Sequence, residues 1–399
     1  MKRILMIAGV LALIFGAVWW SIGSDWRRLL TSPPTDSDVL FWSQSQREAG
    51  FRMMDRLPFM VQTRAIPAGD VVAPLTVGQP LELGMDVNTY MAEQNHASLV
   101  ILQDGNLRLE AYGLDFTEDG RWTSFSVAKS LTSTLVGAAI KDGYIQSLDA
   151  DVTDYIEGLK GSSYDGVTVA QLLSMSSGVA WNEDYSDPQS DVALFSTHES
   201  DDGLPPVVSY MSKLGRAHPA GKVWNYSTGE TNLIGILVSE ATGKPLADYL
   251  AETIWGPYGM EQDATWLLTP DGREISGCCI QAATRDFARF GQFILEGAII
   301  DGQSVVPNGW LDTATLSQIE TPFRGEGYGY QWWTYDDGTF AARGIFGQGI
   351  FIDRERNLVV AMNSNWTTAL GAEGGERGDR EAFYRKVQAV IDAETAGAS

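Results

Sequence analysis

A short motif, S-F-S-V-A-K-S at residues 124–130, stands directly before an apolar run at residues 131–140. The run is rich in alanine, leucine and valine, which predicts a helix with Ser126 at or near its N-terminus. Ser126 and Lys129 are three residues apart, so on a helix their side chains lie on one face. The motif therefore places a hydroxyl and an amine together at the start of a helix.

This arrangement suits acyl transfer. A serine hydroxyl is a poor nucleophile until a nearby base takes its proton. Lys129 can be that base if burial or neighbouring positive charge keeps its amine neutral. The helix N-terminus adds partial positive charge and free N–H groups, which suit a developing oxyanion. A capping serine beside a solvated lysine would show the same pattern, so the interpretation depends on the rest of the chain.

Charge and composition exclude some functions. The 399 residues carry a formal net charge of −23, whereas nucleic-acid binding needs a basic face. His96, His198 and His218 are scattered and show no metal-ligand spacing. We therefore expect no nucleic-acid partner, no metal and no cofactor. The adjacent Cys278 and Cys279 are predicted to be two small, unbridged side chains in the core, because disulfide geometry needs a suitable separation.

The N-terminus is predicted to contact a membrane. Residues 4–23 form an apolar run after a basic start, and such a helix spans roughly 30 Å, the thickness of the bilayer core. Trp19 and Trp20 fall where an interfacial aromatic belt would lie. Residues 1–24 are thus expected to anchor the chain in a bacterial inner membrane, with its catalytic domain in the periplasm. A cleaved signal peptide, releasing the chain to the periplasm, is the alternative.

The order of predicted elements indicates an α/β fold of the α+β kind. Residues 25–95, interrupted by prolines, are predicted to form a stalk and an N-terminal arm that wraps onto the main domain. In residues 96–399 we expect a hairpin around Asp104-Gly105, the Ser126 helix, further helices, an antiparallel meander and a terminal helix. The prediction is an antiparallel sheet flanked by helices, with an all-helical insertion subdomain at about 150–267.

Three local patterns give more detailed predictions. An apolar helix is expected over residues 232–242, ending at Gly243. Another helix, over residues 285–295, is predicted to be capped by Thr284. The aromatic-rich segment 328–335 is predicted to be one strand of the meander.

Two further segments can supply the partners that Ser126 needs. The chain has no G-x-S-x-G motif, and no histidine lies in a stretch typical of a catalytic triad. Tyr226 lies in a short polar loop before the predicted helix of residues 232–242, where its hydroxyl can relay a proton. The glycine-rich segment 344–349 begins a strand that can approach a ligand and supply an oxyanion N–H. A rim tyrosine and a β-bulge would also explain these segments.

Taken together, these segments resemble the serine β-lactamase and penicillin-binding-protein family, in its class C-related branch. S-x-x-K on a helix, a tyrosine loop after a helical segment and a glycine-rich strand occur in the order typical of that family. Within it the chain is most similar to the 6-aminohexanoate-dimer hydrolases, from about residue 90 to the C-terminus. The matching segments are Ser126–Lys129, Asn182–Tyr185 with Asp187-Pro188, Tyr226-Ser227, Ala283–Arg289, Gln331–Trp333 and Gly344–Gln348.

The resemblance implies a β-lactamase/transpeptidase-like fold and a role for each matching residue. Ser126 is the expected nucleophile, Lys129 its general base and Tyr226 the proton relay to the leaving group. The N–H groups of Ser126 and Ile345 are the expected oxyanion hole. Tyr185 is expected to contact the substrate amide from the insertion loop. The other predicted substrate contacts are Asp184, Gly344, Gly347 and Gln348.

Two departures weaken an antibiotic-resistance function. True β-lactamases carry Lys-Thr-Gly where this chain has Ala-Arg-Gly at residues 342–344, and the tyrosine motif here is Tyr-Ser-Thr rather than Tyr-Ala-Asn. Arg343 is the one residue there that can replace the missing lysine. Asp286 is expected to cap or brace its helix rather than to react. Acidic side chains around Asp184 in the insertion loop suggest a substrate with an amine-bearing end.

The leading expectation is a membrane-tethered or secreted serine hydrolase that cleaves a small amide or ester through an acyl-enzyme. A β-lactamase or D-Ala-D-Ala carboxypeptidase is the enzymatic alternative. A non-catalytic binding module that uses the same cleft is the alternative of another class. The oligomeric state is not predicted.

Overall fold

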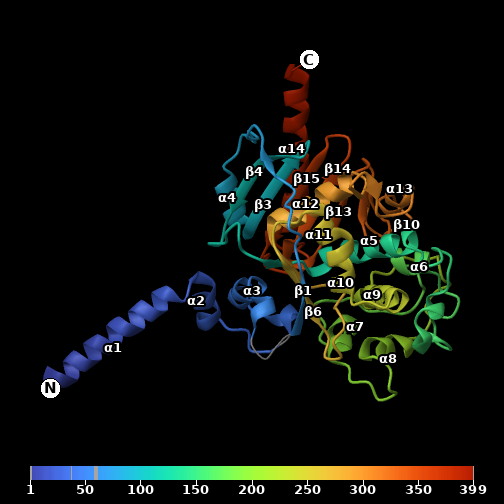
Figure 1. Ribbon diagram of the computed structural model, residues 1–399, viewed down its shortest axis with the longest axis horizontal. Coiled ribbons are helices and arrows are strands. Elements are labelled where there is room, and N and C mark those ends of the chain that lie inside the picture. The colour runs from blue at the N-terminus through green and yellow to red at the C-terminus, as the bar shows by residue number, and fades with distance from the viewer. Residues whose placement is uncertain (1, 37, 58–61, 399) are drawn as a thin grey trace.

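Helix α1 (Lys2–Ser21) extends away from the rest of the molecule (Figure 1). The computed structural model describes residues 2–36, 38–57 and 62–398; Met1, Ser37, residues 58–61 and Ser399 lie outside that description. An 18-residue stretch of α1, Ile4–Ser21, is apolar and is not covered by any other described part of the chain. Its length and composition suit either a signal peptide or a membrane anchor.

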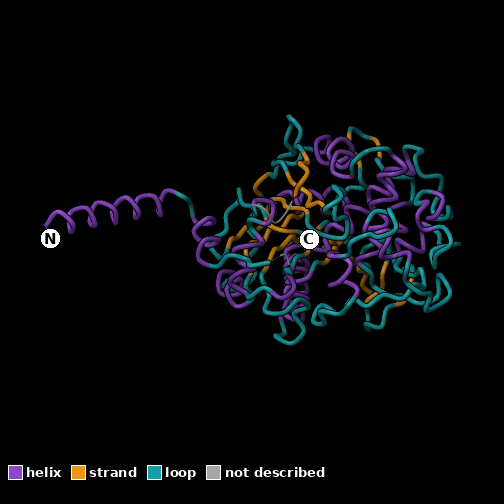
Figure 2. The backbone as a smooth tube through the Cα atoms, turned by 90° about the horizontal axis from the view of Figure 1, so that it is seen from below, coloured by secondary structure: helices purple, strands orange, loops and turns teal. Residues whose placement is uncertain are grey.

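A nine-stranded sheet forms the centre of the main domain (Figures 1 and 2). The strand order is β10-β11-β12-β13-β14-β15-β3-β4-β2, and neighbours are antiparallel except for β2 and β4. The predicted hairpin at Asp104-Gly105 joins β3 to β4. The strands are β2 (Thr76–Val77), β3 (His96–Gln103), β4 (Asn106–Tyr112), β10 (Ile319–Glu320), β11 (Glu326–Tyr328), β12 (Trp333–Tyr335), β13 (Phe340–Arg343), β14 (Gly349–Asp353) and β15 (Leu358–Ser364).

Helices cover both faces of this sheet. Successive side chains of a strand point to opposite faces, and in β15 Val359 packs in the core with helix α12 (Thr284–Leu295). Its neighbour Val360 packs on the opposite side with α14 (Glu376–Ala398), near α4 (Val87–Glu93). These layers confirm the predicted antiparallel sheet flanked by helices.

A group of helices lies beside the sheet and packs around α5 (Ala128–Lys141) and α9 (Thr228–Thr242). Helix α9 begins four residues earlier than predicted, because the Ser227 hydroxyl accepts a hydrogen bond from the Glu230 N–H at 3.1 Å and caps it. It ends at Gly243, as predicted. The other helices here are α6 (Val169–Leu173), α7 (Asp191–Leu194), α8 (Pro206–Ser212), α10 (Leu246–Leu250) and α11 (Gly256–Tyr258).

The segment that follows α1 packs against the main domain (Figure 1). It contains α2 (Ser24–Thr31) and α3 (Gln44–Phe51), and its Phe51 is fully buried. The Phe51 ring lies 5.8 Å from that of Trp122 in a second, four-stranded sheet of order β1-β6-β7-β5. The segment therefore shares a core with the strand that precedes Ser126. The strands of the small sheet are β1 (Gln62–Ile66), β5 (Trp122–Thr123), β6 (Ala264–Leu268) and β7 (Ile280–Ala282).

Two local predictions are wrong. Segment 328–335 is not one strand, because Gln331 adopts a left-handed conformation (φ 63°) in a turn that separates β11 from β12. Thr284 is the first residue of α12 rather than its cap. Its hydroxyl is hydrogen-bonded to the Ser98 hydroxyl at 2.6 Å and to the Asn363 amide at 2.8 Å. In both cases the tertiary environment overrides the local pattern.

Candidate active site

Ser126 lies where β5 passes into α5, in a single 3₁₀ turn over Phe125–Val127. Phe125 has a φ of 41°, which is uncommon for an aromatic residue. Its ring is held between those of Phe51 and Phe346, at centroid distances of 4.9 and 5.6 Å. Ser126 is half-buried, whereas Phe125 and the residue after Ser126 are buried. The turn thus presents Ser126 at the wall of a cavity.

Lys129 is buried one helical turn further on, with 1% of its surface exposed. Its Nζ donates to the Gly277 carbonyl at 2.9 Å and to the Thr228 hydroxyl at 3.0 Å. A Cβ at Gly277 would lie only 3.0 Å from this Nζ, so a glycine allows the approach. Burial lowers the pKa of Lys129 to about 8, although the charge of Glu183 acts against this. The amine is therefore neutral more often than that of an exposed lysine, as a general base requires.

Tyr226 approaches Ser126 from the residues just before α9. Burial, followed by the charge of Glu183, raises the pKa of Tyr226, so the phenol stays protonated at neutral pH. The Ser126 hydroxyl is close enough to the Tyr226 hydroxyl to lower its pKa somewhat, against the larger effect of burial. The ring stacks on Trp333 with a centroid distance of 5.8 Å and lies 5.3 Å from the Lys129 Nζ. The structure therefore brings Ser126, Lys129 and Tyr226 together.

Glu183 joins this group, although the sequence interpretation assigned it no role. Its carboxylate accepts hydrogen bonds from the Thr228 N–H at 2.9 Å, from the Thr228 hydroxyl and from the Tyr185 hydroxyl at 2.8 Å. The predicted contact Asp184 is exposed and binds Ser186 instead. Adjacent residues of an extended segment point in opposite directions. The sequence thus identified the segment, but only the fold shows which of its two carboxylates binds Thr228, the hydrogen-bond partner of Lys129.

Ile345 lines the same cavity as Ser126. It follows β13, whose end closely approaches the turn that holds Ser126. A Cβ at Gly344 would lie 2.7 Å from the Ser124 carbonyl oxygen, so only glycine permits this approach. The arrangement agrees with a backbone N–H at Ile345 beside Ser126.

Two predicted substrate contacts lie behind this surface. Gln348 is fully buried, and its amide donates to the carbonyls of Ile345 and Ser364, both at 3.0 Å. Gly347 has a φ of 94°, and a Cβ there would lie 2.5 Å from the Trp366 ring. Gln348 and Gly347 therefore brace the turn from the core side. Among the described residues, neither they nor Asp184 and Gly344 line the cavity, whereas Tyr185 does.

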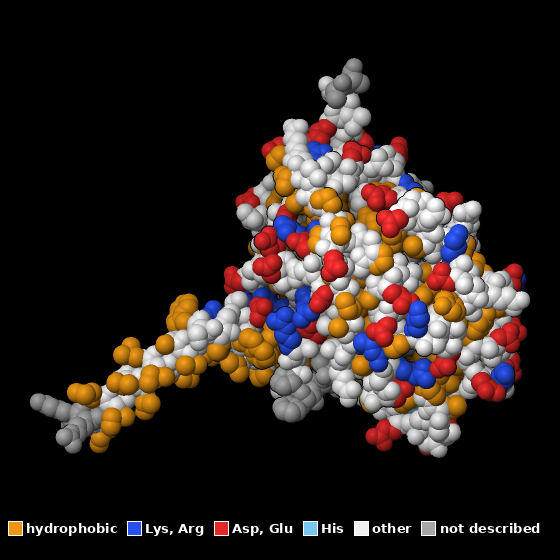
Figure 3. Space-filling model, viewed as in Figure 1, with side chains coloured by type: hydrophobic (Ala, Val, Ile, Leu, Met, Phe, Trp, Pro, Cys, Tyr) orange, Lys and Arg blue, Asp and Glu red, His pale blue; other side chains and the backbone are white. Residues whose placement is uncertain are grey.

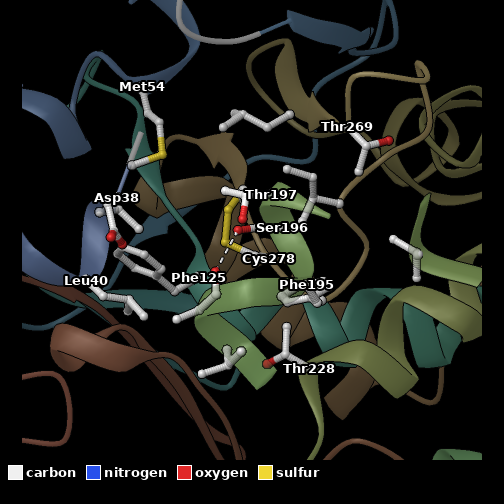
Figure 4. Close-up of a pocket in the computed structure, with 18 of the residues that line it drawn as sticks. Asp38, Leu40, Met54, Phe125, Phe195, Ser196, Thr197, Thr228, Thr269 and Cys278 are labelled. Atoms are coloured by element: carbon white, nitrogen blue, oxygen red, sulfur yellow. Dashed lines mark hydrogen bonds between the residues drawn. A yellow bond between two sulfur atoms is a disulfide. The ribbon is translucent and has the colours of Figure 1, made fainter. Parts of the chain in front are cut away.

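The cavity beside Ser126 has a volume of about 550 Å³ (Figure 4). Figure 4 shows Phe125, Phe195 and Cys278 on its walls. This size is within the range of small-molecule binding sites.

A disulfide between neighbouring cysteines forms part of the cavity wall (Figure 4). Cys278 is bonded to Cys279, so the prediction of two unbridged side chains is wrong. Cys279 has a left-handed φ of 76°. Adjacent side chains ordinarily diverge, and this backbone conformation turns the two sulfur atoms toward each other.

Comparison with known proteins identifies the family. Residues 87–382 match the family model described as beta-lactamase, so the chain belongs to the β-lactamase family of hydrolases. A curated relative, the 6-aminohexanoate-dimer hydrolase of Paenarthrobacter ureafaciens, is 28% identical over 346 residues, which are 82% of this chain and 87% of the relative. These matches confirm the resemblance inferred from the motifs.

Solved structures show the same fold. A Bacillus anthracis protein assigned as a 6-aminohexanoate-dimer hydrolase superposes with a TM-score of 0.76 at 21% identity, over 88% of this chain and 95% of that one. A D-stereospecific amidohydrolase from Streptomyces superposes with a TM-score of 0.56 at 18% identity, over 72% of this chain and 96% of the other. At such identities the likeness supports the fold alone.

Proposed function

We propose that this chain is a serine hydrolase that cleaves a small amide or ester through an acyl-enzyme on Ser126. The observation that carries the proposal is the convergence of a buried lysine of lowered pKa and a protonated tyrosine on one partly exposed serine. Such a group fits an activated nucleophile with its base and proton relay. The similarity to an amide-cleaving relative supports the same reaction class.

The geometry suggests a role for each group. The Ser126 Oγ attacks the substrate carbonyl while the neutral Lys129 amine takes its proton. The N–H groups of Ser126 and Ile345 stabilise the oxyanion of the tetrahedral intermediate. Tyr226 passes a proton to the leaving amine or alcohol as the bond to the carbonyl carbon breaks. The proton held by Lys129 then restores the Tyr226 phenol. Water attacks the carbonyl of the acyl-enzyme while Lys129, with the help of Tyr226, takes its proton, and that proton passes to the Ser126 oxygen as the acid product leaves.

Glu183 is a positioning residue in this scheme. It binds both the N–H and the hydroxyl of Thr228, and that hydroxyl accepts a hydrogen bond from the Lys129 Nζ at 3.0 Å. It also holds the Tyr185 hydroxyl at the cavity wall. One carboxylate therefore sets the orientation of the base and of a substrate contact.

The surroundings of Arg343 argue against the β-lactamase alternative. Its guanidinium pairs with Glu326 at 3.0 Å and lies 4.2 Å from the centre of the Trp333 ring. Glu326 also pairs with Arg377 at 2.7 Å. Because Glu326 and the Trp333 ring hold the Arg343 guanidinium, we do not expect it to replace the lysine that would hold a drug carboxylate. An amide or ester without that carboxylate suits the site better.

The envelope location remains part of the proposal. The apolar helix α1 is either an inner-membrane anchor or a signal peptide. Both outcomes place the catalytic domain outside the cytoplasm, in the periplasm.

Labelling of the full chain, purified in detergent, with a fluorophosphonate probe tests the proposed mechanism. The wild type should be labelled on Ser126, whereas Ser126→Ala and Lys129→Ala should not react. The exposed Ser186→Ala is the control that should keep full labelling. A wild-type chain that stays unlabelled, or a Ser126→Ala chain that is labelled equally, would contradict the proposal.

A further inference from the structure

We propose that the substrate of this site carries an apolar chain on its acyl side, and that this chain binds in the cavity against the N-terminal segment. The inference rests on the proposed function, since it assumes that Ser126 attacks the carbonyl. The expected substrate is an ester or amide of an aliphatic or aromatic carboxylic acid whose acyl chain carries no charged group.

The cavity walls are mainly apolar. Among the described lining residues there is no lysine or arginine, and Asp38 is the one carboxylate. A charged substrate group would lose its hydration there and find little compensation. The apolar lining residues include Leu40, Trp42, Phe125, Phe195, Leu268 and Ile345.

The acidic side chains of the insertion loop bind elsewhere, so the expected amine-binding role finds no support. Asp191 accepts hydrogen bonds from the Tyr210 hydroxyl at 2.6 Å and from the Asn182 N–H at 2.7 Å. Asp201 and Asp202 pair with Lys213 at 2.8 and 3.4 Å. These carboxylates are therefore held by donors of the chain itself, and Lys213 balances one of their charges.

The position of Tyr226 assigns the cavity to the acyl side. A tyrosine that protonates the leaving group must lie beside that group. Among the described residues, Tyr226 does not line the cavity, whereas Ser126, Phe125 and Ile345 do. Tyr185, Thr228 and Gly277 reach the cavity from the polar side of Ser126, whereas most of its lining belongs to the segment after α1 and to the residues around Phe195 and Cys278. The aromatic neighbours of Tyr226, Trp224, Tyr328 and Trp333, are not among the described lining residues. The larger part of the cavity therefore lies away from the proton relay, where the acyl group of the intermediate would lie.

The segment after α1 contributes an apolar wall to this cavity. Val39, Leu40 and Trp42 line it from the connection between α2 and α3. Apolar side chains also gather on the surface where α1 meets the main domain (Figure 3). Two that are exposed there are Trp26 and Leu30, with 41% and 61% of their surface accessible. An aliphatic chain in the cavity would thus contact the apolar side chains that this segment supplies.

A chain-length series on the full-length protein tests the inference. With p-nitrophenyl acetate, butyrate, hexanoate and octanoate, kcat/KM should rise about fourfold per buried methylene group. With methyl, butyl and octyl acetate, which lengthen the alcohol instead, it should stay within about threefold. Octanoate esters in phosphatidylcholine vesicles, compared with monomeric esters, show whether the chain is taken from a bilayer or from solution.

The outcomes separate this inference from the proposed function. If Ser126-dependent hydrolysis of the acetate is measured but the acyl series is flat or falls, the inference is wrong and the hydrolase assignment stands. An increase in the alcohol series alone would place the apolar chain on the leaving-group side and would also overturn it. If no acyl ester or amide is hydrolysed and Ser126 is not labelled, both fail.

Two neighbouring residues provide a matched pair of variants. Leu40 lines the cavity, whereas Phe41 points to solvent with 46% of its surface exposed. Leu40→Ser should lower kcat/KM for the octanoate about tenfold and leave the acetate nearly unchanged; Phe41→Ser should change neither. An equal loss on both esters with Leu40→Ser would contradict the inference. Leu268→Ser, at the end of β6 and also on the cavity wall, repeats the test if Leu40→Ser does not fold.

Discussion

The two sides of Ser126 differ in how they are built. On one side, hydrogen bonds link Lys129 to Glu183 through Thr228, across α5, the start of α9 and the insertion loop, and the Tyr226 ring lies beside the Lys129 amine. On the other side, the segment after α1 and the residues around Cys278 form an apolar cavity wall. The polar side is suited to moving protons, and the apolar side to selecting what is cleaved.

This difference explains why the sequence motifs predicted the residues of the polar side but not those of the apolar wall. The chemistry of proton transfer requires certain side chains at certain spacings. An apolar wall can be built from any side chains of suitable size, so its members carry no sequence signature. The substitutions predicted below each change side chains on one of these two sides and leave those on the other side unchanged.

The largest effect is expected on the polar side. Lys129→Met removes the proposed base while keeping much of its volume, so kcat/KM should fall about 10²- to 10⁴-fold. Lys141→Met, at the exposed end of the same helix, is the matched control and should remain active. Steady-state hydrolysis of p-nitrophenyl butyrate gives the comparison. A Lys129→Met enzyme with wild-type activity would show that another group is the base.

On the apolar side, the packing beneath the nucleophile should matter for stability. Phe51→Ala removes a buried ring that contacts Phe125 and Trp122, so the free energy of unfolding should fall by about 3–5 kcal/mol. Phe41→Ala, in the same segment but exposed, should change it by less than about 0.5 kcal/mol. Urea unfolding followed by tryptophan fluorescence measures both. Equal stabilities would mean that this segment does not pack on the main domain.

Glu183→Gln should have a smaller effect on the polar side. The glutamine amide would point N–H donors at the donors of Thr228 and Tyr185 that now bind the carboxylate. Because these hydrogen bonds would be lost, kcat/KM should fall about 10- to 100-fold. The exposed neighbour Asp184→Asn should stay near wild type. Circular dichroism confirms that both variants fold. If Asp184→Asn were the more damaging change, the assignment of the two carboxylates would be reversed.

The pH profile is the mildest test. Since Lys129 has a pKa of about 8, kcat/KM should rise about tenfold per unit as pH approaches 8 and level off above it. The pKa of Lys129 in the folded chain is below that of an ordinary lysine. At pH values between these two pKa values, the unfolded chain therefore binds more protons than the folded chain. Stability should therefore rise with pH above about 8. Activity that falls through pH 8 would contradict a neutral lysine base.

The sequence predicted the polar side in most of its parts. The spacing of Ser126 and Lys129, the tyrosine before α9 and the glycines after β13 follow from local pattern, because a helix or strand fixes which neighbours share a face. The central sheet and its covering helices were predicted for the same reason. Thr284 and residues 328–335 were mispredicted, since their hydrogen bonds are made with distant parts of the chain.

By itself, then, the sequence indicated the family and the order of the elements and predicted the proposed catalytic group, all of which depend on residues near one another in the chain. The tertiary structure decided what lies around that group. It selected Glu183 over Asp184, joined Cys278 to Cys279 and brought Leu40 to a cavity beside Ser126. These features depend on the relative placement of segments that are far apart in the chain or on a single backbone angle, and residue spacing encodes neither.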